Sequence, residues 1–197
     1  MSTKKKPVDE RPVVSFEDQD TWNKWLAAHH AKSPGVWLKL AKKRPGVAAL
    51  DYAGALTAAL AWGWIDGQKS SLDDTAWLQG FSPRGRRSIW SKINREKALA
   101  LIAAGKMQPA GLAEVERAKA DGRWDAAYDS QSKSVVPEDL AAALAANPRA
   151  EAFFATLNSV NRYAVLFRIH NVKKAETRAR KIATFVTMLA NHEKLYP

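Results

Sequence analysis

The spacing of apolar residues changes from helical to extended over the first part of the chain. Trp22, Trp25 and Leu26 recur at the spacing of one helical face, and Ser15 lies before them as the expected N-cap. Residues 36–42 then alternate between apolar and polar positions, which predicts a strand with one buried face.

The middle of the chain repeats this change of pattern. Asp51 precedes an alanine-rich apolar segment, 52–62, which predicts a buried helix. The segments 64–68 and 76–81 are separated by a polar turn, so we expect two antiparallel strands. Two more helices are predicted to follow, one starting at Ser88 and ending at Gly105, and one over 109–122.

Residues 129–136 are polar and have no periodicity, and everything after them has helical spacing. The strongest amphipathic pattern of the chain places Ile182, Phe185 and Leu189 on one face of the last helix. We therefore predict an α+β fold, a small antiparallel sheet packed with helices, followed by a C-terminal helical subdomain. The expected divisions are a flexible lead-in over 1–14, an α+β domain over 15–128, a linker over 129–136 and a helical region over 137–197.

Composition narrows the range of possible functions. The chain contains no cysteine, which excludes disulfides and cysteine-based metal sites, and it has no apolar run long enough to span a membrane. A cytoplasmic location without membrane insertion is therefore expected. The formal net charge of +11 is spread along the sequence and favours an anionic partner, although a solvated basic surface would have the same composition.

Candidate chemistry is concentrated between Ala61 and Asn94, which hold four of the eight tryptophans and a run of arginines. Aromatic, acidic and basic side chains in one segment predict a binding site for a small anionic or aromatic ligand. Each of these residues also has a purely structural interpretation, as core aromatic, turn residue or solvated charge. The predicted ligand-binding residues are Trp64, Asp66, Lys69, Arg84, Trp90 and Asn94.

Two other functions remain possible from the sequence. The chain could bind nucleic acid without sequence specificity, through Lys42, Lys43, Arg44, Arg86, Arg87, Arg178 and Lys181. It could also be an enzyme with Asp66 as general acid or base, but no second catalytic group lies at a recognisable spacing. The histidines lack the spacing of metal ligands, and no phosphate-binding glycine loop is present, so we expect neither a metal nor a cofactor.

Several motifs together resemble the YdeI/OmpD-associated bacterial family, also called bacteriocin-protection proteins. They are WLKLAKK from Trp37, GWIDGQK from Gly63, FSPR from Phe81, SIWSK from Ser88 and KAETRARKI from Lys174. The resemblance extends over roughly Phe16 to His192. It implies an α+β N-terminal region and a helical C-terminal region, a role in protection against bacteriocins or cationic antimicrobial peptides, and association with an outer-membrane porin.

Overall fold

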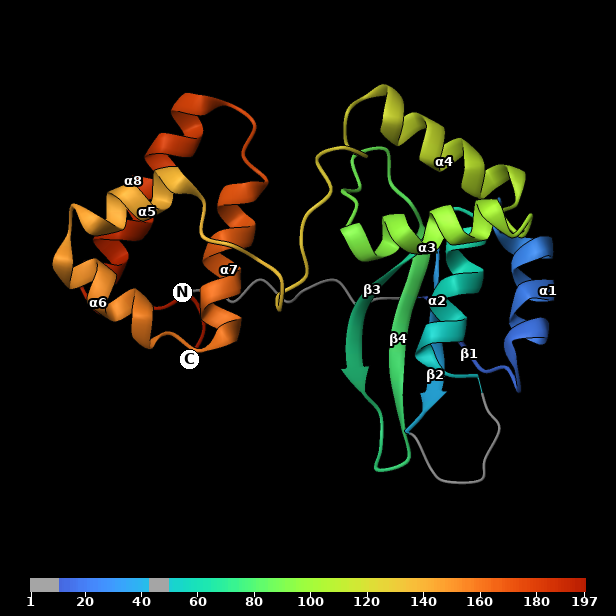
Figure 1. Cartoon of the computed structure of the whole chain (residues 1–197). Coiled ribbons are helices and arrows are strands. Elements are labelled where there is room, and N and C mark those ends of the chain that lie inside the picture. Colours follow the sequence, from blue (N-terminus) through green and yellow to red (C-terminus); the bar gives the residue numbers. More distant parts are fainter. Residues whose placement is uncertain (1–10, 43–49) are drawn as a thin grey trace, which may run out of the picture. The chain divides into compact units, whose positions relative to one another are not determined.

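A computed structural model describes residues 11–42 and 50–197 and shows an α+β protein (Figure 1). These residues contain four strands and eight helices, so the predicted fold class is confirmed. Their order is β1 (Val13–Val14), α1 (Gln19–His29), β2 (Val36–Ala41), α2 (Tyr52–Ala61), β3 (Trp64–Ser71), β4 (Ala76–Pro83), α3 (Lys92–Ala103), α4 (Pro109–Ala120), α5 (Glu138–Ala145), α6 (Pro148–Thr156), α7 (Ser159–His170) and α8 (Ala175–Ala190).

The chain divides into two compact units. The first comprises the chain up to Trp90 together with Asn94–Ala126, and it contains the sheet. The second comprises Ser91–Ile93 and Ala127–Pro197, and it contains the four C-terminal helices. Each unit has its own hydrophobic core, as expected of separate compact units.

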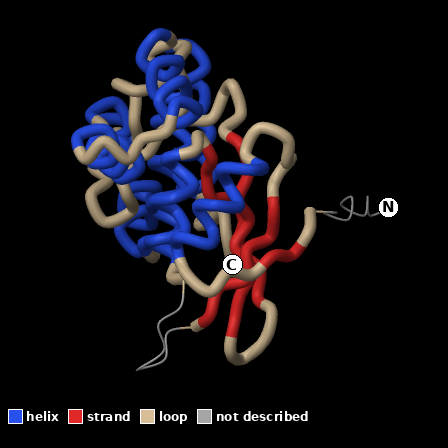
Figure 2. Tube along the Cα trace, turned by 90° about the vertical axis from the view of Figure 1, so that its right-hand side faces the viewer, coloured by secondary structure: helices blue, strands red, loops and turns tan. Residues whose placement is uncertain are grey.

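The four strands form one sheet in the order β1-β2-β4-β3 (Figure 2). The predicted antiparallel pairing of β3 with β4 is present, and β2 runs antiparallel to β4 on its other side. The edge strand β1 instead pairs parallel to β2, with Val13 opposite Trp37. The sheet is therefore mixed and not purely antiparallel, because two residues from the predicted lead-in over 1–14 add a parallel edge strand.

β2 buries alternate side chains, as its sequence pattern predicts. Val36, Leu38 and Leu40 are buried, and the side chains between them are partly or fully exposed. The buried face is covered by aromatic residues of α1. The ring of Trp22, which has no exposed surface, lies 5.8 Å from the ring of Phe81 on β4. This aromatic contact joins the helix to the centre of the sheet.

The start of α1 differs from the prediction. Asp18, and not Ser15, is the N-cap, and its carboxylate accepts a 2.8 Å hydrogen bond from the backbone N–H of Thr21. The hydroxyl of Thr21 accepts a 3.3 Å hydrogen bond from the Asp18 N–H, which completes a capping box. Because this exchange satisfies donors at the helix start, the helix begins three residues later than expected.

The start of α3 also differs, since this helix begins at Lys92 and not at Ser88. The N–H of Ser88 donates to the carbonyl of Gly85 at 2.9 Å, which makes a turn. The carbonyls of Ser88 and Ile89 accept hydrogen bonds from the guanidinium groups of Arg123 and Arg84. Carbonyls held in this way are not available for a helical first turn.

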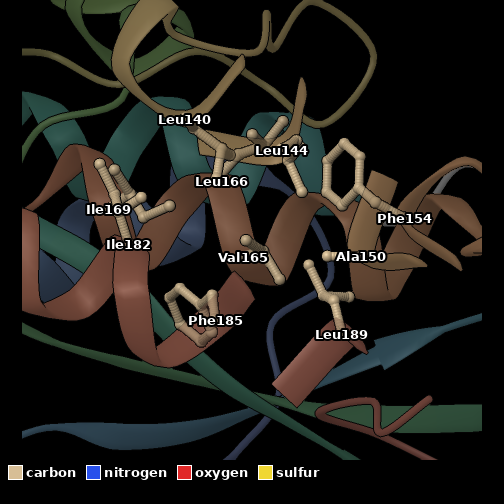
Figure 3. Close-up of a cluster of buried hydrophobic side chains, with 10 residues drawn as sticks. All are labelled: Leu140, Leu144, Ala150, Phe154, Val165, Leu166, Ile169, Ile182, Phe185 and Leu189. Atoms are coloured by element: carbon tan, nitrogen blue, oxygen red, sulfur yellow. The ribbon is translucent and has the colours of Figure 1, made fainter. Parts of the chain in front are cut away.

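The second unit is built around a buried apolar cluster contributed by its four helices (Figure 3). Ile182, Phe185 and Leu189 of α8 are all buried in it, which confirms the amphipathic pattern of the last helix. The other buried members are Leu140, Leu144, Ala150, Phe154, Val165, Leu166 and Ile169. Among the described residues, no helix combines the length and the apolarity needed to cross a membrane.

Candidate functional site

Three of the residues predicted to bind a ligand are buried in the first unit, namely Trp64, Trp90 and Asn94. Trp64 is 1% exposed, and its indole N–H donates a 3.1 Å hydrogen bond to the carbonyl of His30. Trp90 packs edge-on against Trp124, with ring centroids 5.0 Å apart. These contacts are the ones that core tryptophans make.

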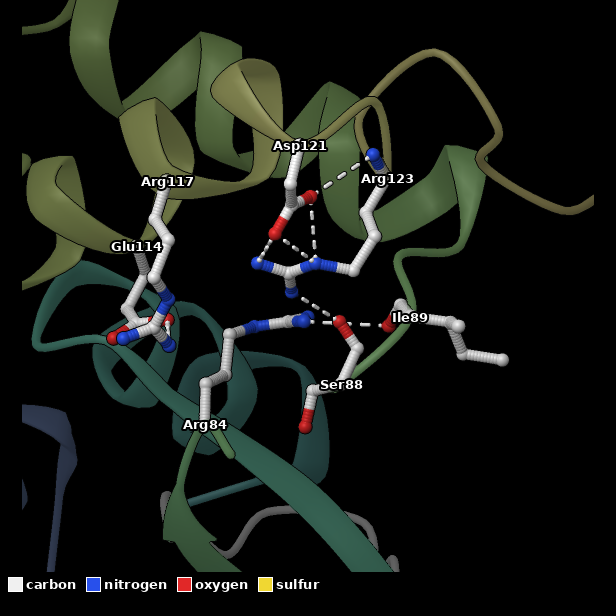
Figure 4. Close-up of polar contacts among 7 residues, drawn as sticks. All are labelled: Arg84, Ser88, Ile89, Glu114, Arg117, Asp121 and Arg123. Atoms are coloured by element: carbon white, nitrogen blue, oxygen red, sulfur yellow. Dashed lines mark hydrogen bonds and ion pairs between the residues drawn. The ribbon is translucent and has the colours of Figure 1, made fainter. Parts of the chain in front are cut away.

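Arg84, a fourth predicted residue, is 5% exposed. Its guanidinium carbon lies 3.6 Å from the centroid of the Trp90 ring. Its Nη1 donates a 3.3 Å hydrogen bond to the carbonyl of Ile89 (Figure 4). The structure thus brings Arg84 and Trp90 together in a buried cation–π contact, in which the arginine covers the face of the indole.

A cluster of charged side chains surrounds this arginine (Figure 4). Arg123 donates from Nε to both carboxylate oxygens of Asp121 at 2.8 Å, and from Nη1 to the carbonyl of Ser88 at 2.7 Å. Glu114 and Arg117 of α4 form an ion pair. Burial raises the pKa of the Glu114 carboxyl, although the neighbouring arginines act in the opposite direction. The cluster holds the loop after β4 against the end of α4.

The remaining two predicted residues lie on β3 and have partners of their own. The carboxylate of Asp66 accepts a 2.8 Å hydrogen bond from the hydroxyl of Tyr52. The ammonium group of Lys69 lies 3.8 Å from the centroid of the Trp77 ring. The register of β3 against β4 shifts between Asp66 and Lys69, so the two side chains do not follow the alternation of a regular strand.

The residues of the nucleic-acid hypothesis lie in both units. Lys42, Arg86 and Arg87 of the first unit are exposed, and Lys43 and Arg44 lie outside the described residues. Arg178 and Lys181 belong to α8 of the second unit. The Arg178 guanidinium is bound to the carboxylate of Asp139, and the Lys181 ammonium lies 5.9 Å from the centroid of the Phe185 ring.

The second unit contains a pocket that opens to solvent. Its empty volume is about 450 Å³ when the space at its mouth is included. Its walls come from α7, from the start of α8 and from the segment that precedes α5. The lining residues are Tyr128, Asp129, Ser134, Val135, Pro137, Tyr163, Leu166, Phe167, His170 and Arg178. The combination of an apolar wall with a few polar groups is typical of small-molecule sites.

Three aromatic rings form one wall of the pocket. The ring of Tyr128 meets that of Phe167 edge-on, with centroids 4.9 Å apart and an interplanar angle of 87°. Tyr163 also contacts Phe167, with ring centroids 5.8 Å apart. The Tyr163 hydroxyl donates a 3.0 Å hydrogen bond to the backbone carbonyl of Asp129. This bond fixes the ring relative to the segment leading to α5.

Burial raises the pKa of the Tyr163 phenol, and the nearby Tyr128 and Asp129 act in the same direction. The Tyr163 hydroxyl is therefore a neutral hydrogen-bonding group at physiological pH. The Asp129 carboxylate is paired with the ammonium group of Lys92 at 2.8 Å. The negative charge of the pocket wall is thus compensated within the same unit.

Arg178 contributes a guanidinium group to the lining of the pocket. It binds Asp139 at the start of α5 through Nε and Nη2, at 2.5 and 2.9 Å, and the carbonyl of Ile169 through Nη1 at 2.9 Å. The hydrogen bonds from Arg178 hold the pKa of the Asp139 carboxyl below its ordinary value. These three bonds use three of the five N–H groups of the guanidinium, so it can still donate to a ligand.

The sequence analysis did not find this pocket. It named Arg178 for its charge alone, and it placed Tyr163 and Phe167 on a helix without giving them a chemical role. A usable signal was the recurrence of Tyr163, Phe167 and His170 at i, i+4 and i+7 of α7, which puts three aromatic side chains on one helical face. In the parts of the chain that the structure describes, no group of three or more His, Asp or Glu side chains is placed to hold a metal ion.

Two family descriptions match different parts of the chain. Residues 14–114 match a domain of unknown function, DUF8412. Residues 133–192 match the family described as Bacteriocin-protection, YdeI or OmpD-Associated. The resemblance inferred from the sequence is confirmed by this second match, whereas the motifs around Trp37 and Gly63 lie in the first. No curated protein and no solved structure matches the chain significantly.

Proposed function

We propose that this chain, which belongs to the DUF8412 family and carries a YdeI/OmpD-associated domain in its second unit, binds a small aromatic anion in the pocket of that unit. The observation that supports the proposal is the pocket itself. Aromatic rings form one wall, and basic side chains from α7 and α8 line another part of it. The lining residues from Ser134 to Arg178 lie in the part of the chain that matches the YdeI/OmpD-associated family, and Tyr128 and Asp129 precede that part.

The aromatic preference follows from the ring wall. Tyr128 and Phe167 pack edge-to-face and are held by the fold, so they lose little entropy when a ligand covers them. A planar ring can pack against such a wall, with Leu166 and Val135 supplying further apolar contact. The volume of the pocket suits a single-ring compound better than an extended one.

The anionic preference follows from the charges. Lys92 compensates the Asp129 carboxylate, while Arg178 retains donor capacity beyond its bonds to Asp139. His170, at the C-terminal end of α7, adds an imidazole to the pocket lining. The formal net charge of +11 further favours the approach of anions to the protein.

The proposed function offers an indirect explanation for the bacteriocin-protection description of the family. A protein with a formal net charge of +11 repels cationic peptides, so direct capture of such peptides is unfavourable. A small aromatic anion, by contrast, is attracted to the protein and can act as a signal or a metabolite. We propose that any protective role, such as a response to stress or to antimicrobial peptides, depends on this ligand.

The proposal is tested by titrating the isotope-labelled full chain with benzoate and para-hydroxybenzoate while amide chemical shifts are recorded. Shifts should concentrate at the segment around Asp129 and at α7. Benzamide, which has the same ring without the negative charge, should bind several-fold more weakly because it lacks the charge-assisted hydrogen bond. Tyr163→Phe removes the hydrogen bond that fixes the ring wall to the Asp129 carbonyl, and His170→Gln replaces an imidazole of the lining. Each should reduce benzoate affinity by about fivefold to tenfold.

Tyr196→Phe is the matched control, because it removes a tyrosine hydroxyl from the same unit outside the pocket lining. It should leave benzoate affinity unchanged. Equal binding of benzoate and benzamide would contradict the anionic part of the proposal. Chemical-shift changes that map to the first unit would show that benzoate does not bind in the pocket. An undiminished benzoate affinity in both pocket variants would show the same.

A further inference from the structure

The pocket of the second unit has different hydrogen-bonding groups at its two ends. Tyr163, Phe167 and His170 follow one another along α7, and all three line the pocket. Tyr163 and His170 are two helical turns apart, which corresponds to about 10 Å along the helix axis. These two residues therefore mark opposite ends of the α7 wall, one beside Tyr163 and one beside His170.

The end beside Tyr163 presents hydrogen-bond acceptors. The Tyr163 hydroxyl donates its proton to the Asp129 carbonyl at 3.0 Å, which leaves the lone pairs of the phenolic oxygen for a ligand. The Asp129 side chain also lines the pocket, and 34% of it is accessible to solvent. Lys92 binds Oδ2 of Asp129 at 2.8 Å, but a carboxylate has about four lone-pair sites and can accept further hydrogen bonds.

The end beside His170 presents hydrogen-bond donors. Nη1 of Arg178 donates to the carbonyl of Ile169, the residue before His170, which places the guanidinium at this end. Arg178 has N–H groups beyond the three that bind Ile169 and Asp139. A ligand carboxylate would accept charge-assisted hydrogen bonds at this end, whereas the Asp129 carboxylate would repel it at the other.

We propose that the aromatic anion bound in this pocket carries a hydroxyl group para to its carboxylate, and that the Asp129 carboxylate selects it by accepting the hydroxyl hydrogen bond. This ligand assignment rests on the proposed function and makes its ligand class more specific. A para-substituted ring, with a hydrogen bond of about 2.8 Å at each end, spans ends that are roughly two helical turns apart. The ligand lies with its carboxylate at Arg178 and its hydroxyl beside Asp129 and Tyr163.

A neutral hydroxyl suits the Asp129 end better than an ammonium group does. The Lys92 ammonium lies 2.8 Å from the Asp129 carboxylate, so a second cation at this end would meet like-charge repulsion. A methoxy group has no proton to donate and cannot bind these acceptors. The pocket therefore discriminates among para substituents by their charge and by their ability to donate a hydrogen bond.

Isothermal titration calorimetry on the full chain compares benzoate, para-hydroxybenzoate, para-methoxybenzoate and para-(aminomethyl)benzoate. Para-hydroxybenzoate should bind about tenfold more tightly than benzoate, because it adds a hydrogen bond to a charged acceptor. The methoxy and aminomethyl compounds should bind no more tightly than benzoate. Equal affinities for benzoate and para-hydroxybenzoate, with benzoate still bound in the pocket, would overturn the hydroxyl preference alone. A lack of benzoate binding would overturn the proposed function as well.

The role of Asp129 is tested by the ratio of the two affinities, because a general disturbance of the pocket weakens both ligands alike. Asp129→Asn should reduce the preference for para-hydroxybenzoate to about twofold or less, since the acceptor loses its charge. Lys92→Gln removes the ion-pair partner of Asp129 but keeps the charged acceptor. The preference should therefore remain about tenfold or rise in Lys92→Gln, while the affinity for benzoate falls because the Asp129 charge is no longer compensated.

Glu151→Gln is the matched control, because it removes an exposed carboxylate of α6 in the same unit outside the pocket lining. It should leave both affinities unchanged. An undiminished preference for para-hydroxybenzoate in Asp129→Asn would show that another group accepts the hydroxyl hydrogen bond. Loss of the preference to the same extent in Lys92→Gln would show that the ion pair only holds the pocket in shape. Either outcome would overturn the assignment of Asp129.

Discussion

Arg178 of α8 holds the carboxylate of Asp139 at the start of α5 with two hydrogen bonds, Nε to Oδ2 at 2.5 Å and Nη2 to Oδ1 at 2.9 Å. The same guanidinium donates to the carbonyl of Ile169 near the end of α7. One side chain therefore connects three helices of the second unit at the edge of its pocket. Bidentate pairing of this kind fixes direction as well as distance.

Replacing Asp139 with asparagine should destabilise the second unit by about 1 kcal/mol, because the pair is half-exposed and partly screened. Glu138→Gln is the matched control, since it removes a neighbouring first-turn acid that does not contact Arg178. Urea unfolding followed by circular dichroism measures both. Equal destabilisation by the two variants would show that the helix dipole, and not the ion pair, is responsible.

The Asp139–Arg178 pair also makes the free energy of unfolding depend on pH. The pKa of the Asp139 carboxyl is lowered in the folded protein, so its stabilisation is present above the ordinary value of 3.8 and is lost as pH falls through the folded pKa. Acid unfolding of the wild type should therefore be steeper in this range than that of Asp139→Asn. Parallel acid unfolding curves for the two proteins would contradict the assignment.

Arg84 offers a test of how the loop after β4 is held. Arg84→Ala removes a buried guanidinium from the face of Trp90 and leaves the Ile89 carbonyl without this donor, so it should cost about 2–3 kcal/mol of unfolding free energy. Arg86→Ala, in the same loop but exposed, should change stability by less than about 0.5 kcal/mol. Thermal and urea unfolding compare the two. A stable Arg84→Ala protein would mean that the arginine is not needed for folding.

The N-cap of α1 gives a paired test within the first unit. Asp18→Ala should lower the urea midpoint and the melting temperature measurably, since it removes the capping box with Thr21. Ser15→Ala should have no measurable effect, although the sequence alone favoured Ser15 as the cap. A larger loss of stability in Ser15→Ala than in Asp18→Ala would show that Ser15 is the N-cap, as the sequence predicted.

Local patterns of apolar and polar residues predicted much of the fold, because they depend directly on which side chains are buried. The alternation of Val36, Leu38 and Leu40 and the helical spacing of Ile182 and Phe185 each describe one buried face of one element. They needed no knowledge of distant residues. The α+β class and the helical C-terminal region follow from such patterns.

The candidate site was harder to predict because its determinants come from different elements. The sequence predicted that Arg84 binds a ligand and that a helix starts at Ser88. In the structure Arg84 and Arg123 instead bind the carbonyls of Ile89 and Ser88, and the helix starts later. The parallel edge strand at Val13 is too short to give a periodic signal. The pocket combines Tyr128 with Tyr163 and Arg178, and their proximity depends on how the helices pack.

Tyr163 gives a pH test of the pocket wall. Its pKa is raised above the ordinary value of 10.0, mainly by burial, so the folded protein retains the phenolic proton more strongly than the unfolded chain does. Its contribution to stability is therefore complete below the ordinary pKa and is lost as pH rises through the folded value. Tyrosinate absorbance during alkaline titration should show a component that ionises late.

Tyr163→Phe should delete this late component and should also lose about 1 kcal/mol of stability, because the hydrogen bond to the Asp129 carbonyl is removed. Tyr196→Phe should leave the late component in place. Because benzoate in the pocket would bury Tyr163 further and add negative charge beside it, saturation with benzoate should delay the ionisation again. An ionisation of Tyr163 that is indifferent to benzoate would place the ligand elsewhere in the protein.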